Sequence, residues 1–595
     1  MIPSWLDAAL RGRNMVVRVA LHVVTIAGLV GTLLLVPAVE EFYNRGVSTG
    51  RGWNPIPHTD VNPMGINTFL NEEADPAVVE RSLDMIRDGG YGFIRQIFGW
   101  YEIEPQPGVY VDANGRSTWE KYDRIVDLAT ERGIQIIARL EKPPPWSKEN
   151  QPNPTVDGPP DRIEDYANFV EQVVTRYRDR ITYVQLWNEP NLEGEWGAKP
   201  IDPEGYVELL AAGAEAAREA NPDIVILLAG LAPTDQTGPE NLSDLLFLEQ
   251  VYEHGGAEYF DIVSVMVYGY GFPPTDRRLE FARNNFSRPI QTREIMVRHG
   301  DEEKPIWAVE YGWVSLPDDW DGEPSPWGKP VSEATQAQYL YDGYLRAQRE
   351  WPWMGVMAVW AFRFPYAPDS PEQADNPTQG FALVRHDFTP RPAFLKLQRN
   401  AARIQAHATG SYIVSDDMQV RFDRGDPVDI RMAGERLDLY VSGTGMVERI
   451  IDGVLHEPIS FETDGNVGER LTVASGLRDR MHTISLRVSR PPGEPPPEII
   501  GYVVSHSWFH LWAYPWLVGV LLIVLAGNLG SLGWAVWDWR ESRTQSPLDD
   551  EDSTEGGEPD VAGDDPVVED EVAEQADAES LDPDDTASVV GRTTE

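Results

Sequence analysis

The stretch of sequence from residue 181 to residue 191 reads ITYVQLWNEPN, a short apolar run that ends in Asn188, Glu189 and Pro190. Similar runs, separated by amphipathic stretches, begin at Met64, Phe93, Ile134, Ile224, Asp261, Pro305 and Gly355. Short buried strands that alternate with helices form parallel sheets, and eight strand–helix units close into a barrel. We therefore predict an α/β fold, a (β/α)8 TIM barrel over residues 64–405, with a doubly wound open sheet as the alternative.

The stretches between the runs carry apolar residues three and four positions apart, the spacing of helices that cover a sheet. The predicted helices are Pro76–Asp88, Trp119–Arg132, Ile163–Arg178, Pro203–Ala220 and Glu333–Glu350.

Two glutamates stand where predicted strands end. Glu189 closes the fourth run, and Glu310 closes the seventh, PIWAVEYG from residue 305 to residue 312. Chemistry in a (β/α)8 barrel is located at these carboxyl ends, and a carboxylate beside aromatic residues costs desolvation energy. Cleavage of a glycosidic bond needs one carboxyl group that protonates the leaving oxygen and a second that attacks the anomeric carbon or activates water. Glu189 and Glu310 are therefore the predicted catalytic residues.

With these motifs, the region from about residue 60 to residue 405 resembles a clan of retaining glycoside hydrolases built on (β/α)8 barrels, which includes cellulase-like and β-xylosidase-like families. The resemblance implies that Glu189, in Asn-Glu-Pro, is the acid/base and that Glu310 is the nucleophile. It also implies that Asn188 contacts the 2-hydroxyl group of the sugar.

Three more positions match the clan. The resemblance implies that Arg95 supports the nucleophile and that Tyr268 donates a hydrogen bond to it. It also implies that Trp360 forms the aromatic floor of the sugar-binding site. Many relatives carry a histidine two residues before the tyrosine, where this chain has Met266. A relative's substrate contacts therefore do not transfer directly.

Tryptophans near the predicted loops either stack on sugar rings or pack in the core. They are Trp100, Trp146, Trp196, Trp313, Trp320 and Trp327. We take Trp100, Trp146 and Trp313 as candidate substrate-binding residues.

The composition excludes several other classes of protein. There are no cysteines among the 595 residues, so disulfides and thiolate metal sites are excluded. The formal net charge of -46 argues against nucleic acid as a partner. The scattered histidines show no metal-ligand spacing, and no glycine-rich phosphate loop precedes a helix, so we expect no metal and no cofactor. The expected partner is an oligosaccharide or polysaccharide substrate.

Two apolar segments, residues 19–39 and 511–537, are predicted transmembrane helices because each has about the length that a bilayer core requires. Flanking charges orient them, with basic residues expected on the cytoplasmic side. The relevant residues are Arg11, Arg13, Arg18, Arg540 and Arg543 on one side and Glu40 and Glu41 on the other. We expect a cell-membrane protein with both termini in the cytoplasm and the barrel outside. A long signal peptide cut near Ala38 is the alternative for the first segment.

The remaining segments differ in composition. We interpret residues 1–18 as a cytoplasmic N-terminus, residues 40–63 as a linker rich in Gly, Pro and Asn, and residues 490–510 as a stiff Pro-rich spacer. Alternating segments between residues 411 and 489, among them MQVRF, predict a small antiparallel β-sandwich. Residues 546–595 are dominated by Asp and Glu and predict a disordered acidic tail, for which no partner is assigned.

The sequence thus favours a membrane-anchored retaining glycoside hydrolase that acts outside the cytoplasm. The alternative is a non-catalytic glycan-binding sensor or an envelope scaffold with an inactive barrel.

Overall fold

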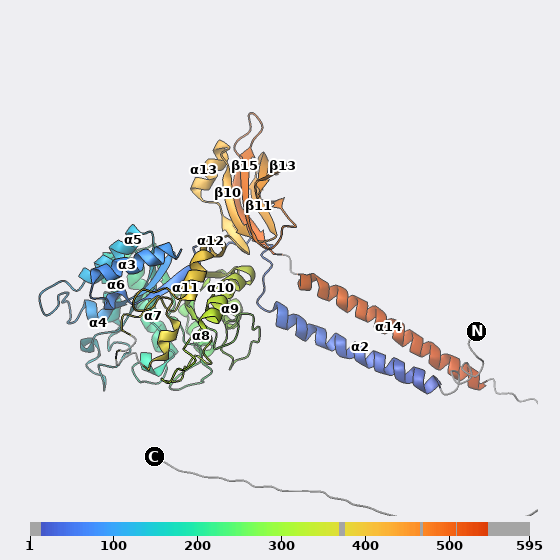
Figure 1. The fold of residues 1–595 in the computed structure, drawn as a ribbon, viewed down its shortest axis with the longest axis horizontal. Helices are drawn as coiled ribbons and strands as arrows, with labels where there is room; N and C mark the ends of the chain where they lie inside the picture. Colours follow the sequence, from blue (N-terminus) through green and yellow to red (C-terminus); the bar gives the residue numbers. More distant parts are fainter. Residues whose placement is uncertain (1–13, 368–369, 371–374, 464–467, 507–508, 545–595) are drawn as a thin grey trace, which may run out of the picture. The chain divides into compact units, whose positions relative to one another are not determined.

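The computed structural model describes residues 14–367, 370, 375–463, 468–506 and 509–544. Residues 23–528 form one compact unit, which contains a barrel and a sandwich (Figure 1). The second unit includes, among the described residues, 14–22 and 529–544. The predicted acidic tail, residues 546–595, lies outside the described residues, as do residues 1–13 of the predicted N-terminus.

Eight parallel strands form the barrel in the order β5-β4-β3-β2-β1-β8-β7-β6. They are β1 Met64–Thr68, β2 Phe93–Gly99, β3 Gln135–Glu141, β4 Tyr183–Leu186, β5 Val225–Leu227, β6 Val263–Tyr268, β7 Ile306–Gly312 and β8 Met354–Val359. Parallel bridges Leu227↔Ile262 and Leu231↔Val265 connect the two outer strands of this order. The bridges nearly close the barrel, so the predicted (β/α)8 architecture is confirmed and the open sheet is excluded.

Helices follow the strands around the barrel. They are α3 Pro76–Asp88, α4 Trp100–Ile103, α5 Glu120–Glu131, α6 Ile163–Arg176, α7 Pro203–Ala220, α8 Asp244–Glu253, α9 Pro289–Arg298, α10 Glu333–Glu350, α11 Pro392–Arg399 and α12 Ala401–Ile404. Local chemistry sets their starts: Asp75 caps α3 by accepting from the Ala77 N–H, and Ser332 caps α10 by accepting from the Thr335 N–H. Both helices have the predicted bounds.

The barrel interior is filled by side chains and is not an open channel. At its base the rings of Phe93, Tyr183 and Trp307 have centroids 4.8 to 5.7 Å apart. The Trp307 indole N–H donates to the carbonyl oxygen of His58 at 2.9 Å. This packed base leaves the carboxyl ends of the strands as the end of the barrel where a site can form.

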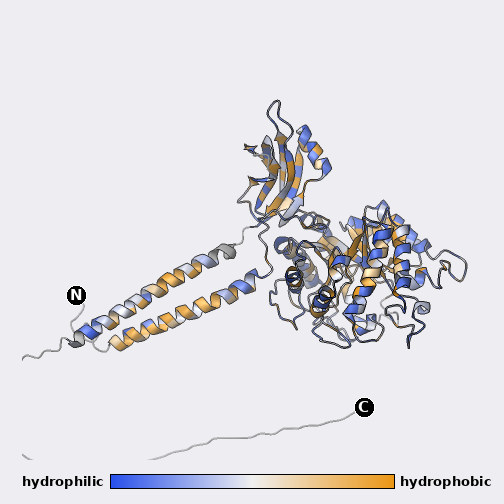
Figure 2. Cartoon of the chain, turned by 180° about the vertical axis from the view of Figure 1, so that it is seen from behind, coloured by the Kyte–Doolittle hydropathy of each residue, from blue (hydrophilic) through white to orange (hydrophobic). Residues whose placement is uncertain are grey.

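A β-sandwich follows the barrel in the chain. One sheet has the order β10-β15-β12-β13 and the other β14-β11-β16-β9. The elements are β9 Gly410–Ile413, α13 Asp416–Arg424, β10 Val428–Ala433, β11 Arg436–Ser442, β12 Thr444–Ile451, β13 Val454–Glu462, β14 Glu469–Ala474, β15 Met481–Ser489 and β16 Glu498–Ser505. Inward apolar residues alternate with outward polar ones, and the strands in Figure 2 are accordingly banded orange and blue.

Two expectations about this region are wrong. The run MQVRF is not a strand but part of helix α13, because Ser415 caps the Met418 N–H and Gly425 ends the helix at φ +72°. Met418 and Phe422, four residues apart, pack on the sandwich core from one helix face. The predicted spacer over residues 490–510 contains strand β16, which pairs with β11 and β9 and buries Tyr502 and Val504.

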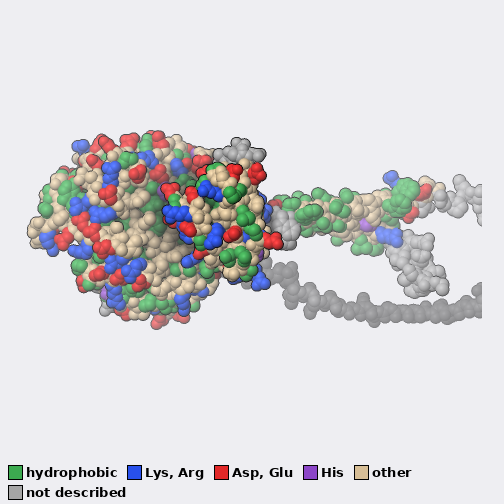
Figure 3. All heavy atoms as spheres, turned by 90° about the horizontal axis from the view of Figure 1, so that it is seen from above, with side chains coloured by type: hydrophobic (Ala, Val, Ile, Leu, Met, Phe, Trp, Pro, Cys, Tyr) green, Lys and Arg blue, Asp and Glu red, His purple; other side chains and the backbone are tan. Residues whose placement is uncertain are grey.

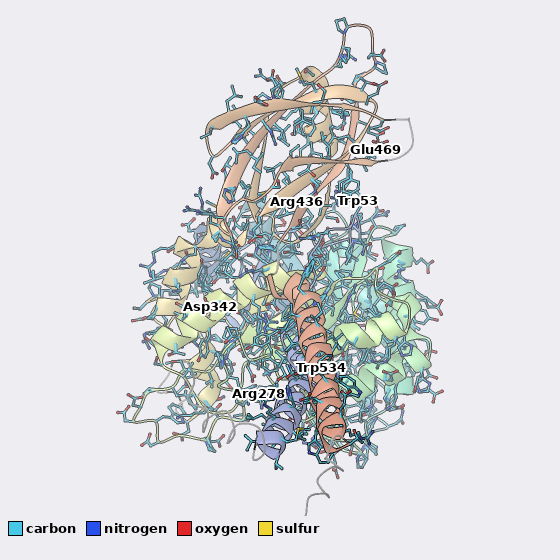
Figure 4. All side chains as sticks on the ribbon, turned by 90° about the vertical axis from the view of Figure 1, so that its right-hand side faces the viewer. Trp53, Arg278, Asp342, Arg436, Glu469 and Trp534 are labelled. Carbon is cyan, nitrogen blue, oxygen red and sulfur yellow. The ribbon has the colours of Figure 1, made fainter. Side chains whose placement is uncertain are left out.

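The predicted linker has no regular element after helix α2 ends at Asn44, yet it makes several contacts with the barrel and the sandwich. Arg45 makes a bidentate ion pair with Glu294 of α9, both N–O distances being 2.7 Å. Trp53 packs against Tyr440 of the sandwich, with ring centroids 4.9 Å apart (Figure 4). His58 meets the barrel base as described above. We call residues 45–58 the strap.

Two described helices are long and apolar enough, by length and composition, to cross a membrane. They are α2 Asn14–Asn44 and α14 Phe509–Thr544, and the candidate spans within them are Met15–Asn44 and Tyr514–Glu541. Both are largely orange in Figure 2, and in Figure 3 charged side chains cover the barrel and sandwich but are sparse along the helical part.

Candidate active site

Glu189 and Glu310 both lie at the carboxyl ends of barrel strands. Glu189 is the third residue after β4, and Glu310 is near the end of β7, where it is paired in register with Met266 of β6. Glu310 is 5% exposed, whereas Glu189 is partly exposed. One carboxyl group is thus enclosed and the other is accessible from outside.

Arg95 of β2 connects the strands at this end of the barrel. Its Nη1 lies 2.8 Å from Glu310 Oε1 and 3.0 Å from Asn67 Oδ1. Its Nη2 donates to Asn188 Oδ1 at 2.6 Å, and its Nε donates to Gln185 Oε1 at 2.8 Å. Burial lowers the pKa of Arg95 to about 10, so the guanidinium remains charged at neutral pH. A single buried cation therefore orients groups from β1, β4 and β7.

Glu310 has a second partner, Tyr268, at the end of β6. The Tyr268 hydroxyl donates a short hydrogen bond to Glu310 Oε2. Burial, followed by the negative charge of Glu310, raises the pKa of Tyr268 well above its usual value, so the phenol stays protonated and remains a donor. With Arg95 on one oxygen and Tyr268 on the other, both carboxyl oxygens of Glu310 accept a hydrogen bond, and these contacts fix its orientation.

Glu189 stands in a different environment. Its backbone adopts φ +44°, and its N–H donates to the carbonyl oxygen of Gly230 at 2.8 Å. Asn188 Nδ2 lies 3.3 Å from Glu189 Oε2, so Asn188 connects Arg95 with Glu189. Burial, followed by the negative charge of Glu310, raises the pKa of Glu189 to about 8. At neutral pH Glu189 is therefore mostly protonated.

Residue 230 is a glycine because there is no room for a side chain at this position. A Cβ at residue 230 would lie 2.9 Å from Val309 Cγ2 and 3.0 Å from Met266 Cε. Met266, which stands where many relatives carry a histidine, is buried in the barrel and occupies this space. Its thioether brings no charge or strong hydrogen-bond donor to the site.

A pocket of about 470 Å³ opens at the ends of β1, β2 and β3. Its lining includes the apolar surfaces of Phe69 and Tyr101 and the cationic side chains of Arg139 and Lys142. Arg139 makes an ion pair with Glu141 at 2.9 Å, while its buried Nε has no hydrogen-bond partner among the described residues. Apolar surface with a few convergent polar groups is typical of a ligand pocket.

The candidate tryptophans separate into two groups. Trp100 and Trp313 are buried, at 0% and 2% exposure, and their indole N–H groups donate to Glu104 and to the Phe272 carbonyl. These two expectations are wrong, because Trp100 begins helix α4 directly after β2 and both rings pack into the core. Trp146 is half-buried and donates to the Glu104 carbonyl, and its role stays a prediction.

Trp360 lies at the end of β8, where the resemblance puts the floor of the sugar site. Its ring packs edge-on against Phe69 with centroids 5.4 Å apart. Its buried Nε1 has no hydrogen-bond partner among the residues that the structure describes.

The other loop tryptophans lie in different surroundings. The ring of Trp327, from the loop after β7, has its centroid 6.1 Å from that of Tyr268. Trp196 is buried, and the Trp320 indole donates to Glu323.

Sequence reasoning missed four residues of this site: Asn67, Arg139, Gln185 and Gly230. Asn67 and Arg139 carried a signal, since each is a polar residue inside an apolar run, MGINTF and IQIIARL. Gln185 lies in the apolar run of Glu189 itself. Among the described residues no group of three or more His, Asp or Glu is arranged to bind a metal ion.

Residues 56–243 match the family model of cellulase, glycosyl hydrolase family 5. The match spans β1 to β5 and contains Arg95, Asn188 and Glu189. No curated protein matches the sequence. The (β/α)8 fold and the family match over residues 56–243 make this part of the chain similar to the cellulase family of glycoside hydrolases, and the expected resemblance to the clan is confirmed.

Solved structures of low sequence identity also match. A family 39 glycoside hydrolase from the gut symbiont Bacteroides cellulosilyticus WH2 is 19% identical, with 72% of this chain and 81% of that chain covered and a TM-score of 0.46. A monomeric beta-xylosidase from Caulobacter crescentus CB15 is 15% identical, with 74% and 98% covered and a TM-score of 0.41. A family 39 enzyme from Xanthomonas axonopodis pv. citri is 14% identical, with 74% and 96% covered and a TM-score of 0.42.

Proposed function

We propose that the chain hydrolyses O-glycosidic bonds with retention of configuration, with Glu310 as nucleophile and Glu189 as acid/base. The observation that carries this proposal is the unequal environment of the two glutamates. Both carboxyl oxygens of Glu310 are held in place by Arg95 and Tyr268, whereas the pKa of Glu189 is raised to about 8. A nucleophile needs the first condition, and a proton donor needs the second.

In the first step Glu310 attacks the anomeric carbon, and the bond to the leaving oxygen breaks as Glu189 donates its proton to that oxygen. The product is an ester between the sugar and Glu310. In the second step Glu189, now ionised, takes a proton from water, and the water oxygen attacks the anomeric carbon and releases Glu310. Each glutamate returns to its starting protonation state, so the cycle is balanced.

The surrounding residues support a sugar as the substrate. Asn188 is held between Arg95 and Glu189, a position suited to the 2-hydroxyl group of a sugar at the anomeric centre. Trp360 offers an aromatic ring and an unpaired N–H, which suit the apolar face and a hydroxyl group of a pyranose. The pocket of about 470 Å³, whose lining includes Phe69, the ring against which Trp360 packs, has room for a saccharide unit.

We also propose that α2 and α14 cross a membrane and hold the barrel outside the cytoplasm. Exposed apolar side chains along both helices favour this, including Leu34, Leu35, Ile523 and Leu529. His22, a polar residue in the first span, lies 3.3 Å from Ser531 of the second, a pairing of the kind that satisfies polar groups in lipid. The flanking arginines favour a topology with both termini in the cytoplasm.

Labelling with 2-deoxy-2-fluoro glycosides tests the mechanism directly. The full chain in detergent is treated with a panel of such reagents carrying good leaving groups, then digested and mapped by mass spectrometry. We expect one sugar unit on the peptide that contains Glu310 and no label in Glu310→Gln. Glu195→Gln, which changes a neighbouring glutamate, should still be labelled.

Label on another residue would refute the assignment of the nucleophile. Binding of glycans without label or turnover across the panel would instead favour the non-catalytic sensor.

A further inference from the structure

One end of the sandwich, formed by both sheets, is close in the chain to the start of α14, as the strand pairing shows. Ala433 of β10 pairs with Met481 of β15, and Ile451 of β12 pairs with Ile484, three residues further along β15. The end of β10, the start of β15 and the β12–β13 turn are therefore at one end of the first sheet.

The second sheet shares this end. Residues 434 and 435 alone connect β10 with Arg436, the first residue of β11, and Arg436 pairs with Ser505, the last residue of β16. Figure 4 labels Arg436 near this end and Glu469, which pairs with Val441 further along β11, toward the other. Helix α14 begins at Phe509, four residues after Ser505, a reach of at most about 14 Å.

The β12–β13 hairpin presents apolar side chains at this end. Asp452 and Gly453, with φ +50° and +82°, form a tight turn between the two strands. Beside the turn Val454 is 59% exposed and Leu455 is 72% exposed. Ile450, which pairs with Leu455, and Met481 at the start of β15 are exposed as well. Singly exposed apolar residues are ordinary, but these four gather at one end of the sandwich.

The hairpin is at the edge of its sheet opposite β10, and the loop before β15 contacts the barrel, since Asp479 pairs with Arg349 of α10 at 3.0 Å. β10, at one edge of its sheet, meets the barrel side through the bridge His407↔Met432, whereas β13 is the opposite edge strand. The turn carboxylate of Asp452 is neutralised by contacts of 2.8 Å with Arg480 and with His482. Arg478 and Arg480 are exposed in the loop that precedes β15. The tip is thus apolar, with exposed cationic side chains nearby.

We infer that the β12–β13 hairpin, through Ile450, Val454 and Leu455, inserts into the surface of the lipid bilayer that α14 enters. This rests on the proposed membrane crossing of α14, not on the proposed hydrolysis. A bilayer surface removes apolar side chains from water and offers phosphate groups to Arg478 and Arg480. The hairpin is then a further membrane contact of the ectodomain, beside the two spans.

The absence of cysteine makes site-specific labelling clean. Leu455→Cys in the full chain is coupled to an environment-sensitive fluorophore, reconstituted in liposomes of mixed neutral and anionic lipid, and quenched by lipids labelled near the headgroup. Glu462→Cys is the matched control, because it is exposed on the same strand about 23 Å further along at 3.3 Å per residue. Val524→Cys, within the proposed span, reports on insertion itself.

We expect shallow-labelled lipids to quench position 455 strongly and position 462 little, and deep-labelled lipids to quench position 524. Quenching at 524 without quenching at 455 would overturn the hairpin proposal and keep the span. Shielding of 455 from an aqueous quencher without lipid quenching would also overturn it, because a second protein surface would then cover the hairpin. Loss of quenching at 524 would refute both proposals while leaving the glycosidase assay unaffected.

Discussion

Replacing Glu189 with glutamine should remove the alkaline limb of the pH–rate profile for substrates with poor leaving groups. Burial and the charge of Glu310 raise the pKa of Glu189 from 4.5 to about 8. At pH 7 about nine in ten of these side chains are then protonated, against about 0.3% at the ordinary pKa. The site therefore raises the population that can act as an acid roughly 300-fold. We expect Glu189→Gln to lower kcat/KM by about 10²- to 10⁴-fold for an alkyl glycoside.

The assay compares two glycosides of the same sugar, one alkyl and one 2,4-dinitrophenyl, across a pH series. In the unmodified enzyme kcat/KM of the alkyl glycoside should fall above about pH 8, whereas the dinitrophenyl glycoside, whose leaving group needs no proton, should not show this limb. In Glu189→Gln the limb should vanish. An alkaline limb that persists in Glu189→Gln, or an equal loss of rate for both substrates, would refute the reasoning.

The same pKa has a consequence for stability. Because the folded-state pKa of Glu189 lies above the unfolded value, folding binds this proton, and the stability contribution falls as pH rises from about 4.5 to about 8. Glu189→Gln should therefore be more stable than the unmodified chain at pH 9, by up to about 4–5 kcal/mol, and differ little from it at pH 4. Thermal denaturation at the two pH values checks the sign.

Three other predictions follow from the contacts of the site. Arg95→Met should leave Glu310 buried without its cation, lowering the free energy of unfolding by about 3–5 kcal/mol, and calorimetry should show it. Trp100→Phe should lower the Tm and leave KM unchanged. Trp360→Phe should raise KM or lower kcat and leave the Tm unchanged. The opposite pattern would reverse the roles assigned to these two residues. Gly230→Ala should displace the backbone that Glu189 bonds and reduce kcat by about 10²-fold, with far-UV circular dichroism unchanged.

The strands of the barrel were predictable because parallel strands buried on both faces leave continuous apolar runs. Each of the eight runs contains a strand, although the run from Ile181 yields a strand only from Tyr183. The sandwich was harder. MQVRF alternates like a strand, but Met418 and Phe422 also share a helix face, and the capping residues decided the outcome. The prolines before Glu498 hid strand β16, whose pairing depends on partners distant in sequence.

The two glutamates of the site were predictable because position at a strand end is a property of local sequence. The contacts of Arg95 were not, because Asn67, Gln185 and Asn188 come from strands that meet only after the barrel closes. The burial of Trp100 could not be predicted from local sequence either. Its place in a loop suggested exposure, but Phe169 of α6 stacks on its ring at 5.3 Å, a contact between distant parts of the chain.

The strap also determines how mechanical load would pass through the molecule. A pull on α2 reaches the bidentate contact between Arg45 and Glu294 first, then Trp53 seated against Tyr440, and only then His58 at the base of the barrel. These contacts follow one another along the chain. A pulling force would therefore break them one after another before it acts on a barrel strand. The carboxyl ends of the strands, where Glu189 and Glu310 lie, are at the opposite end of the barrel and would be the last part to feel a pull on α2.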